Sequence, residues 1–181
     1  MAPVITQEFN VTGDQWRAEE LSNNSKRVIS NFIRVDADEL TYPLHIILRY
    51  KLEQALIRGD LSVPDLPGAW NDAFESSFGT RPSDDLQGCL QDIHWYDGAF
   101  GYFPTYTLGA LAAAQLFSAA RKDYPELLAQ ISKGHFSILL SWLRKNVHSI
   151  GSALSTEEIL IKATGSSLST TAFLAHLNSR Y

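Results

Sequence analysis

The residues best suited to chemistry gather in one stretch, 88–106. It combines an amide, carboxylates, an imidazole, an indole and phenols with three glycines and a proline. Glycine lets the backbone approach a ligand closely, and loops of polar and aromatic residues on a rigid scaffold often form binding sites. This density favours a binding site over a plain surface turn with a few buried aromatic rings. The candidate side chains are Gln91, Asp92, His94, Trp95, Tyr102 and Tyr106.

A second candidate is Arg34, which stands in the apolar run 32–35. An arginine among such neighbours is expected to be at least partly buried, so it needs an anionic partner. Two partners fit equally well at this point: a carboxylate of this chain, or the carboxylate of a ligand. The nearest acidic residues in the chain are Asp36, Asp38 and Glu39.

A polar stripe on a helix is a third candidate. His45, Arg49 and Glu53 are spaced at i, i+4 and i+8, which places them on one face. Oppositely charged side chains at this spacing stabilise a helix by pairing along it. We therefore predict an internal salt-bridge ladder here rather than a site.

Other chemistry finds little support in the motifs. None of the five histidines belongs to a His-Glu-x-x-His sequence, and no phosphate-binding glycine loop or nucleophile elbow is present. A zinc site built from His94, Asp92 and a helix carboxylate stays open as an alternative. Cys89 has no nearby basic residue before His94 and is expected to be a packed thiol rather than a nucleophile.

Composition narrows the class of protein. The 181 residues are 45% hydrophobic, which predicts a globular chain, and carry a net charge of −5, which argues against a nucleic-acid partner. One cysteine cannot form an internal disulfide and is typical of a reducing compartment. The N-terminus does not resemble a signal peptide, and no apolar run reaches the roughly 18 residues of a membrane span. We expect a cytosolic, cytoplasmic protein with no membrane partner.

The periodicity of apolar residues predicts an all-α fold of six or seven helices in a single domain, 1–181, with an irregular lead-in, 1–14. A capping box at Ser155 and Glu158 should start one helix, and Gly59 and Gly165 should end two others. The expected helices are 15–30, 38–58, 65–78, 104–122, a long one at 123–147 with a soft point at Gly134, 155–163 and 169–181.

Two motifs resemble signatures of the carboxypeptidase Taq family, the thermostable cytosolic metallocarboxypeptidases. Ile-Arg-x-x-Ala-Asp occurs at 33–38, and Gly-x-x-Gln-Asp-x-His-Trp occurs at 88–95, both without a mismatch. The segments 39–45, 101–109 and 163–165 agree with the family as well. The resemblance covers about residues 15–181 and implies the C-terminal third of a largely helical, cleft-forming zinc carboxypeptidase.

The resemblance implies a role for each matching residue. Arg34 corresponds to the arginine that engages the terminal carboxylate of the peptide, and His94 to a histidine that bonds the substrate or the tetrahedral intermediate. Tyr102 and Tyr106 line the cleft, Tyr106 also with a catalytic role, and Gln91 adds to substrate binding. Asp92, Trp95 and Asp38 give structural support. The family's zinc ligands and general base are not found in these 181 residues, so no metal or other cofactor is expected in this chain.

Three hypotheses follow. In the first, the chain is a truncated metallocarboxypeptidase-like protein and is inactive alone. It keeps the half of the cleft that binds the substrate carboxylate. Alternatively, it is a non-enzymatic interaction module that self-associates as a homodimer, as family members do. A third possibility is one half of a split carboxypeptidase that a zinc-bearing chain complements. In each case a peptide C-terminus is a possible partner.

Overall fold

The computed structural model describes residues 6–181, which contain helices and no strand, so the all-α prediction is confirmed. The chain divides into two compact units. One consists of residues 26–108, and the other consists of residues 109–181 with the N-terminal segment up to residue 25. The sequence gives no sign of this division, because no linker-like segment separates the two units.

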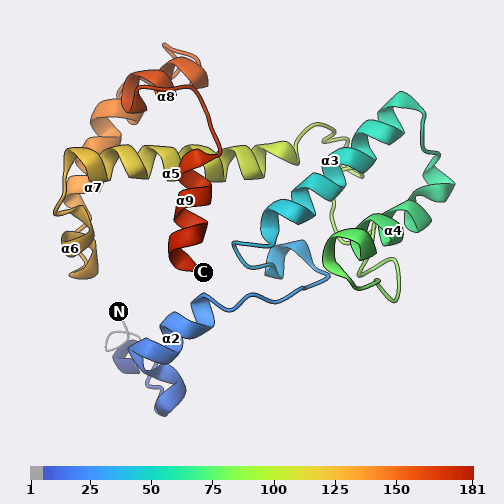
Figure 1. The fold of residues 1–181 in the computed structure, drawn as a ribbon, viewed down its shortest axis with the longest axis horizontal. Helices are drawn as coiled ribbons and strands as arrows, with labels where there is room; N and C mark the ends of the chain where they lie inside the picture. The colour runs from blue at the N-terminus through green and yellow to red at the C-terminus, as the bar shows by residue number, and fades with distance from the viewer. Residues whose placement is uncertain (1–5) are drawn as a thin grey trace. The chain divides into compact units, whose positions relative to one another are not determined.

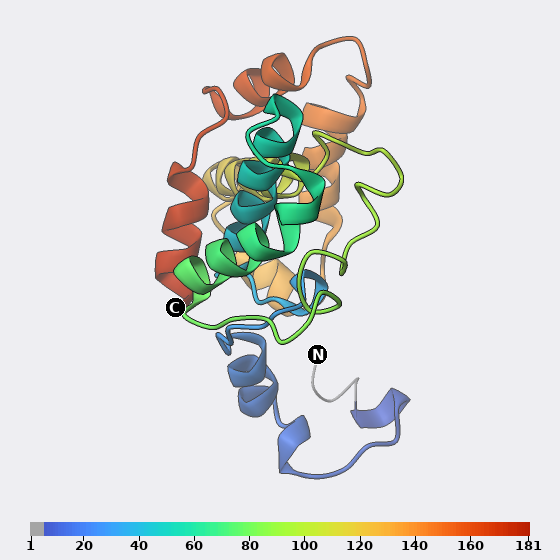
Figure 2. The ribbon, with the colours of Figure 1, turned by 90° about the vertical axis from the view of Figure 1, so that its right-hand side faces the viewer.

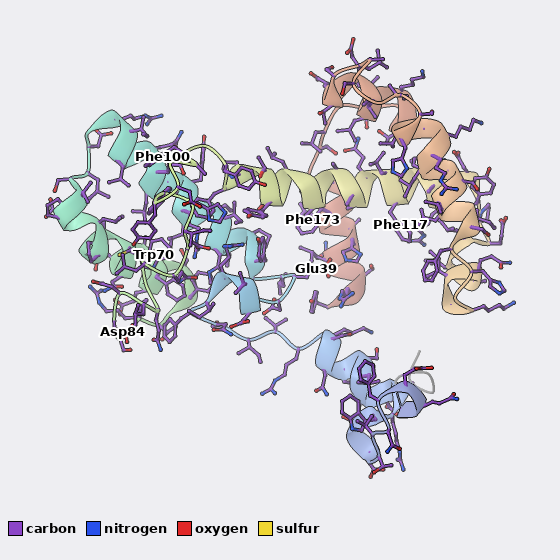
Figure 3. All side chains as sticks on the ribbon, turned by 180° about the vertical axis from the view of Figure 1, so that it is seen from behind. Glu39, Trp70, Asp84, Phe100, Phe117 and Phe173 are labelled. Carbon is purple, nitrogen blue, oxygen red and sulfur yellow. The ribbon has the colours of Figure 1, made fainter. Side chains whose placement is uncertain are left out.

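The unit 26–108 is built on two helices, α3 (Tyr42–Arg58) and α4 (Leu66–Phe78), which lie side by side (Figures 1 and 2). The 3-10 helices η2 (Arg34–Asp36) and η3 (Val63–Asp65) precede α3 and α4. Residues 79–103 follow as a series of turns without a regular helix. The core of the unit consists of Leu48, Leu52, Trp70, Phe74 and Cys89, and Trp70 is labelled in Figure 3. Cys89 is thus packed, as predicted, and burial raises the pKa of its thiol.

Helix α3 begins four residues later than the sequence suggested, at Tyr42 rather than Asp38. The Asp38 carboxylate instead accepts hydrogen bonds from the backbone N–H groups of Leu40 and Thr41, which closes a turn before the helix. Pro43 lies in the first turn of α3, where its missing N–H leaves no bond unmade. The predicted end is confirmed, since Gly59 takes the left-handed conformation at φ 77°.

The other unit holds the remaining helices. They are η1 (Asp14–Trp16), α2 (Ala18–Ser25), α5 (Pro104–Asp123, whose first residues belong to the unit 26–108), α6 (Leu127–Ser132), α7 (Ser137–Leu143), the π-helix η4 (Arg144–His148), α8 (Thr156–Thr164) and α9 (Thr171–Arg180). Two small cores lie within residues 109–181 of this unit. One contains Leu111, Phe173 and Leu177, and the other contains Ala120, Leu127 and Trp142.

Two predicted helices are wrong in extent. The long helix expected at 123–147 is broken near Gly134. Gly134 takes φ 81°, its N–H donates to the carbonyl of Ile131, and α6 ends at Ser132. The helix expected at 15–30 ends at Ser25, whose hydroxyl bonds the carbonyl of Ser22. Short polar side chains compete for backbone groups in this way and weaken a helix.

Two local signals are confirmed. Ser155 Oγ accepts a hydrogen bond from the N–H of Glu158, and the Glu158 carboxylate accepts one from the N–H of Ser155, which is the expected capping box. Gly165 ends α8 at φ 83°. Within residues 6–181, no helix combines the length and the apolar character needed to cross a membrane.

His45 of α3 is the least expected member of the core. Its side chain is fully buried against the rings of Phe74 and Phe78, at centroid distances of 5.7 and 4.6 Å. Neither ring nitrogen has a hydrogen-bond partner within the described part of the chain. Burial, and then the charges of Arg49 and Arg34, lower the pKa of His45 to about 4, so the imidazole is neutral in the folded protein.

Acid should therefore unfold the protein through His45. In the unfolded chain the imidazole binds a proton below about pH 6.5, whereas the folded protein resists protonation down to about pH 4. Stability is fully present above pH 6.5 and falls by on the order of 3 kcal/mol as the pH drops to 4. Urea denaturation at pH 7 and pH 4.5 measures this fall, and His45→Leu should remove most of it.

The exposed His148 provides the matched control. His148→Gln should keep the pH dependence of the wild type. An equally steep loss of stability in His45→Leu would show that another group is responsible.

Candidate active site

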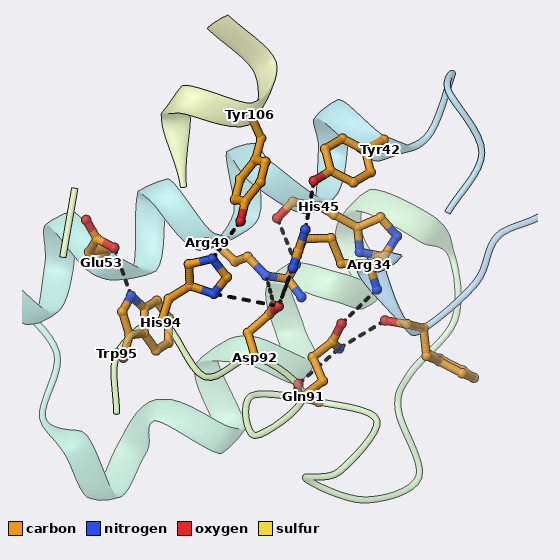
Figure 4. Close-up of polar contacts among 12 residues, drawn as sticks. Arg34, Tyr42, His45, Arg49, Glu53, Gln91, Asp92, His94, Trp95 and Tyr106 are labelled. Carbon is orange, nitrogen blue, oxygen red and sulfur yellow. Dashed lines mark hydrogen bonds and ion pairs between the residues drawn. The ribbon is translucent and has the colours of Figure 1, made fainter. Parts of the chain in front are cut away.

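The site predicted from the sequence lies wholly within the unit 26–108, and its polar contacts are drawn in Figure 4. Arg34 is 6% exposed, and each of its three guanidinium nitrogens makes a hydrogen bond within the chain. Its Nε and Nη2 donate to one oxygen of Asp92 at 3.0 and 2.7 Å, and its Nη1 donates to the hydroxyl of Tyr42 at 2.7 Å. The partner is thus an aspartate 58 residues further along the chain, not one of the nearby acidic residues that the sequence suggested.

Asp92 bridges two arginines. Its other oxygen accepts from Nε of Arg49 at 2.6 Å, so each carboxylate oxygen serves one guanidinium. Arg49 is fully buried, donates from Nη1 to the carbonyl of His45, and lies over the ring of Trp70 at 4.7 Å. We call Arg34, Arg49 and Asp92 the arginine cluster. With two cations and one anion, it carries one unneutralised positive charge.

Electrostatics agree with this charge state. Burial alone would raise the pKa of Asp92, but the hydrogen bond from Arg34 and the charge of Arg49 hold it below the ordinary value. Burial lowers the pKa of Arg49 to about 10, because this guanidinium is removed from water. For Arg34 burial acts to lower the pKa, but the hydrogen bond and charge of Asp92, together with Tyr42, outweigh it, and the pKa is raised. All three groups are therefore ionised at neutral pH.

His94 and the two tyrosines lie against this cluster. Nε2 of His94 lies 3.0 Å from the hydroxyl of Tyr106, and the Tyr106 ring covers the guanidinium of Arg34 at 5.0 Å. Tyr102 packs edge-on against Tyr106 at 5.4 Å and remains half exposed. The structure thus brings together Arg34, His94, Tyr102 and Tyr106, four of the five residues for which the resemblance implies contact with a substrate; the fifth is Gln91.

His94 keeps one polar atom unused. Its Nδ1 is buried and has no hydrogen-bond partner in the described part of the chain. The nearest oxygen of Asp92 lies 3.9 Å away, beyond hydrogen-bond distance. Asp92 therefore binds the two arginines and makes no hydrogen bond to the imidazole of His94.

Gln91 serves as a brace for the loop. Its Nε2 donates to the carbonyls of Phe32, Gln87 and Gly88 at 2.8 to 3.1 Å, and its Oε1 accepts from the backbone N–H of Arg34 at 2.8 Å. Both ends of the amide are thus used within the chain, and a contact between Gln91 and a substrate stays a prediction.

Gly88 makes room for this arrangement. A Cβ atom there would lie 3.2 Å from the carbonyl oxygen of Asp84 and 3.5 Å from a ring carbon of Trp70. Because neither neighbour moves easily, a larger residue would push the loop away from Gln91's partners.

The two remaining support residues fix the ends of the site. Trp95 donates from Nε1 to the carboxylate of Glu53 at 2.8 Å. Asp38 accepts from the N–H of Ile29 at 2.9 Å in addition to its bonds in the turn before α3, and these bonds outweigh burial and lower its pKa. Both residues therefore hold backbone in place.

Sequence reasoning missed the contribution of α3 itself. The stripe of His45, Arg49 and Glu53 is buried, and the predicted salt-bridge ladder is wrong, because Arg49 pairs with Asp92 and Glu53 binds Trp95. The i, i+4, i+8 spacing was the available signal. Charged residues at this spacing face the interior only when another segment supplies their partners. Here that segment is the loop 88–106, which is distant in sequence from α3.

Metal ligands are not assembled within this part of the chain. Among residues 6–181, no group of three or more His, Cys, Asp or Glu side chains is placed to hold a metal ion. The alternative zinc site on His94 and Asp92 is therefore not supported, and Asp92 is already shared by two arginines. The residues described here do not fit the zinc ion that the resemblance implies.

Comparison with known proteins agrees with the motifs. The model of the carboxypeptidase Taq (M32) metallopeptidase family matches residues 1–181. Carboxypeptidase 1 of Bacillus subtilis and thermostable carboxypeptidase 1 of Thermus thermophilus are each 44% identical over 151 residues, which are 83% of this chain and 30% of each relative. The chain thus spans less than a third of the length of these relatives.

A solved structure gives the same result. Metallocarboxypeptidase 1 of Trypanosoma cruzi superposes with a TM-score of 0.93 at 39% identity, over 99% of this chain and 38% of that one.

Asp92→Asn should test the arginine cluster. The amide cannot neutralise either guanidinium, so two buried cations would face each other, and the free energy of unfolding should fall by about 3–5 kcal/mol. Urea denaturation measures the loss.

Asp72→Asn is the matched control, because Asp72 pairs with Arg81 at 2.7 Å on the surface. This exposed pair should contribute less than about 1 kcal/mol. Similar losses in the two variants would contradict a special role of the buried cluster.

Proposed function

Because the chain belongs to the carboxypeptidase Taq (M32) metallopeptidase family, we propose that it recognises the C-terminal carboxylate of peptides. The observation that carries this proposal is the unneutralised positive charge of the arginine cluster, in which Arg34 and Arg49 share Asp92. A ligand carboxylate at Arg34 would complete the charge balance that Asp92 alone leaves at +1. Charge-assisted hydrogen bonds of this kind are among the stronger ones in proteins.

The surroundings of Arg34 support the same ligand. Phenol hydroxyls and an imidazole can donate to a carboxylate or to a carbonyl oxygen of the peptide. Tyr106 and His94 form one hydrogen-bonded pair against the cluster, and the half-exposed Tyr102 packs beside them. In this proposal Arg34 binds the carboxylate, Tyr102 and Tyr106 contact the peptide end, and His94 orients Tyr106. The polar atoms of Gln91 and Asp92 stay committed to the chain.

We infer that the chain by itself binds rather than cleaves. Metal-assisted hydrolysis needs a held metal ion and an activated water, and the 181 residues contain no His-Glu-x-x-His sequence. In the complete enzymes of the family, such ligands would lie on a separate part of the fold. A second chain that carries them would make this chain one half of a split carboxypeptidase. The single cysteine supports a cytosolic setting for either case.

The function can be tested with one peptide in two forms, with a free C-terminal carboxylate and with a C-terminal amide. The free acid should bind and the amide should not. Arg34→Met removes the charge but keeps an unbranched, flexible side chain, and it should weaken binding of the acid roughly 10- to 100-fold. Isothermal titration calorimetry measures the affinity, and release of the terminal residue in the presence of zinc is followed in the same samples, with none expected.

Two further variants sharpen this test. Arg34→Lys keeps the charge and loses the planar fork, so its affinity should be intermediate. Arg81→Met removes an exposed arginine that pairs with Asp72 and Glu75, and it should change nothing. Equal binding of acid and amide by the wild type would refute carboxylate recognition, and turnover by the pure chain would refute the binding-only role.

A second candidate, a self-associating interaction module, is favoured by one face of α3. Ile47, Tyr50 and Ile57 lie on this face at helical spacing and are 44%, 43% and 68% exposed. Contiguous apolar surface of this kind is typical of protein interfaces. Sedimentation equilibrium should therefore detect a homodimer, and Ile47→Glu with Ile57→Glu should shift it to monomer. A wild type that stays monomeric at high concentration would eliminate this candidate.

A further inference from the structure

Glu53 is a buried carboxylate that no role described so far requires. It lies on α3, is 6% exposed, and faces the loop 88–106. Oε2 accepts from the indole N–H of Trp95 at 2.8 Å, and Oε1 accepts from the backbone N–H of Gly101. The carboxylate is thus satisfied by two N–H groups rather than by a cation. Removing a carboxylate from water is costly, so such a group is retained only where its hydrogen bonds fix something.

The two donors stand next to recognition residues. Trp95 directly follows His94, and Gly101 directly precedes Tyr102. Between them the chain turns, and Gly98 and Gly101 take positive φ angles of 70° and 81°. A turn with such glycines has little stiffness of its own. Glu53 therefore binds both ends of this turn, and with them it holds His94 and Tyr102, the residues next to the two donors.

Packing shows the outcome of this tie. The rings of His94 and Tyr102 lie 5.7 Å apart although eight positions separate them in the sequence. Phe103, 1% exposed, lies 4.3 Å from His94 and 5.8 Å from Trp95. His94 is thus held between groups that all belong to the ends of the turn, and the distance from His94 to Tyr106 depends on where those ends lie.

We propose that Glu53 is a positioning residue, which sets the geometry of His94, Tyr102 and Tyr106 by binding Trp95 and Gly101 together. Its functional consequence rests on the carboxylate recognition proposed above. Glu53 does not touch the peptide. It acts through the turn, in the same way that Asp92 acts through Arg34.

Glu53→Gln in the full 181-residue chain tests this role. The carboxamide keeps one acceptor oxygen and replaces the other with an NH₂ group, which faces an N–H donor and cannot bond it. The NMR signals of the His94 ring and the Gly101 amide at fixed pH report the geometry without a ligand. Both should move in Glu53→Gln, and the affinity for the free-acid peptide should fall about tenfold.

Glu157→Gln is the matched control, since Glu157 is an exposed helix residue that undergoes the same chemical change. It should leave the signals and the affinity at their wild-type values. Trp95→Phe keeps an aromatic ring and removes the indole donor, so it should move the His94 signal in the same way. This variant carries the test if circular dichroism shows that Glu53→Gln has lost its helices.

The readouts separate the two proposals. If the wild type does not distinguish acid from amide, carboxylate recognition fails, while a displaced His94 signal in Glu53→Gln still supports positioning by Glu53. A folded Glu53→Gln protein with wild-type signals for His94 and Gly101 would overturn the positioning role. That role would also be overturned if Glu53→Gln bound the acid as tightly as the wild type does, in a chain shown to recognise it.

Discussion

Two buried arginines that share one aspartate are the constraint on which the rest of the unit 26–108 depends. Arg49 is fully buried and Arg34 nearly so, and a guanidinium in such surroundings needs an anionic partner. Asp92 supplies the anion to both at 2.6 to 3.0 Å. The segment before α3, α3 itself and the loop 88–106 each contribute one member, so the cluster joins the loop to two neighbouring segments that are distant from it in sequence.

Helix α3 acts as the scaffold that converts this pairing into a defined loop. His45, Arg49 and Glu53 follow one another at each turn of the helix, and each meets a different partner. His45 packs on the rings of α4, Arg49 holds Asp92, and Glu53 holds Trp95 and Gly101. Because a helix is rigid, the spacing of Arg49 and Glu53 along α3 fixes the positions of the loop residues that they bind. An irregular segment thereby gains the fixed geometry that recognition of a ligand requires.

The sequence is sufficient for the class of fold, because helices and their ends depend on local signals. Apolar periodicity, the Ser155 capping box and Gly59 identify helices and their ends from neighbouring residues alone. The break at Gly134 was visible only as a soft point, since a glycine inside a helical pattern costs little until packing favours a turn. Local propensity cannot decide whether a helix or a turn is more stable at Gly134.

The partners inside the site could not be derived from sequence for a related reason. Arg34 has acidic neighbours within five positions, and proximity along the chain suggests them as its partners. Its true partner is Asp92, because the fold carries the loop 88–106 back to the start of α3. The same fold turns the stripe of α3 from a surface ladder into an interior. Side-chain pairing across such distances is a property of tertiary packing, which single-residue spacing does not encode.

The net charge of the arginine cluster does not depend on a metal ion. The +1 charge that Arg34, Arg49 and Asp92 leave is a property of this chain alone, and it is present at neutral pH whether or not a metal ion is near. The residues that carry this charge all lie within 26–108, and among the described residues 6–181 no three His, Cys, Asp or Glu side chains are grouped to hold a metal ion. If Asp92 neutralised only one arginine, the pair would be electrically balanced and would have no unmet demand for an anion. The second arginine, Arg49, is fully buried on α3, and it is the cation that leaves the cluster with this net charge.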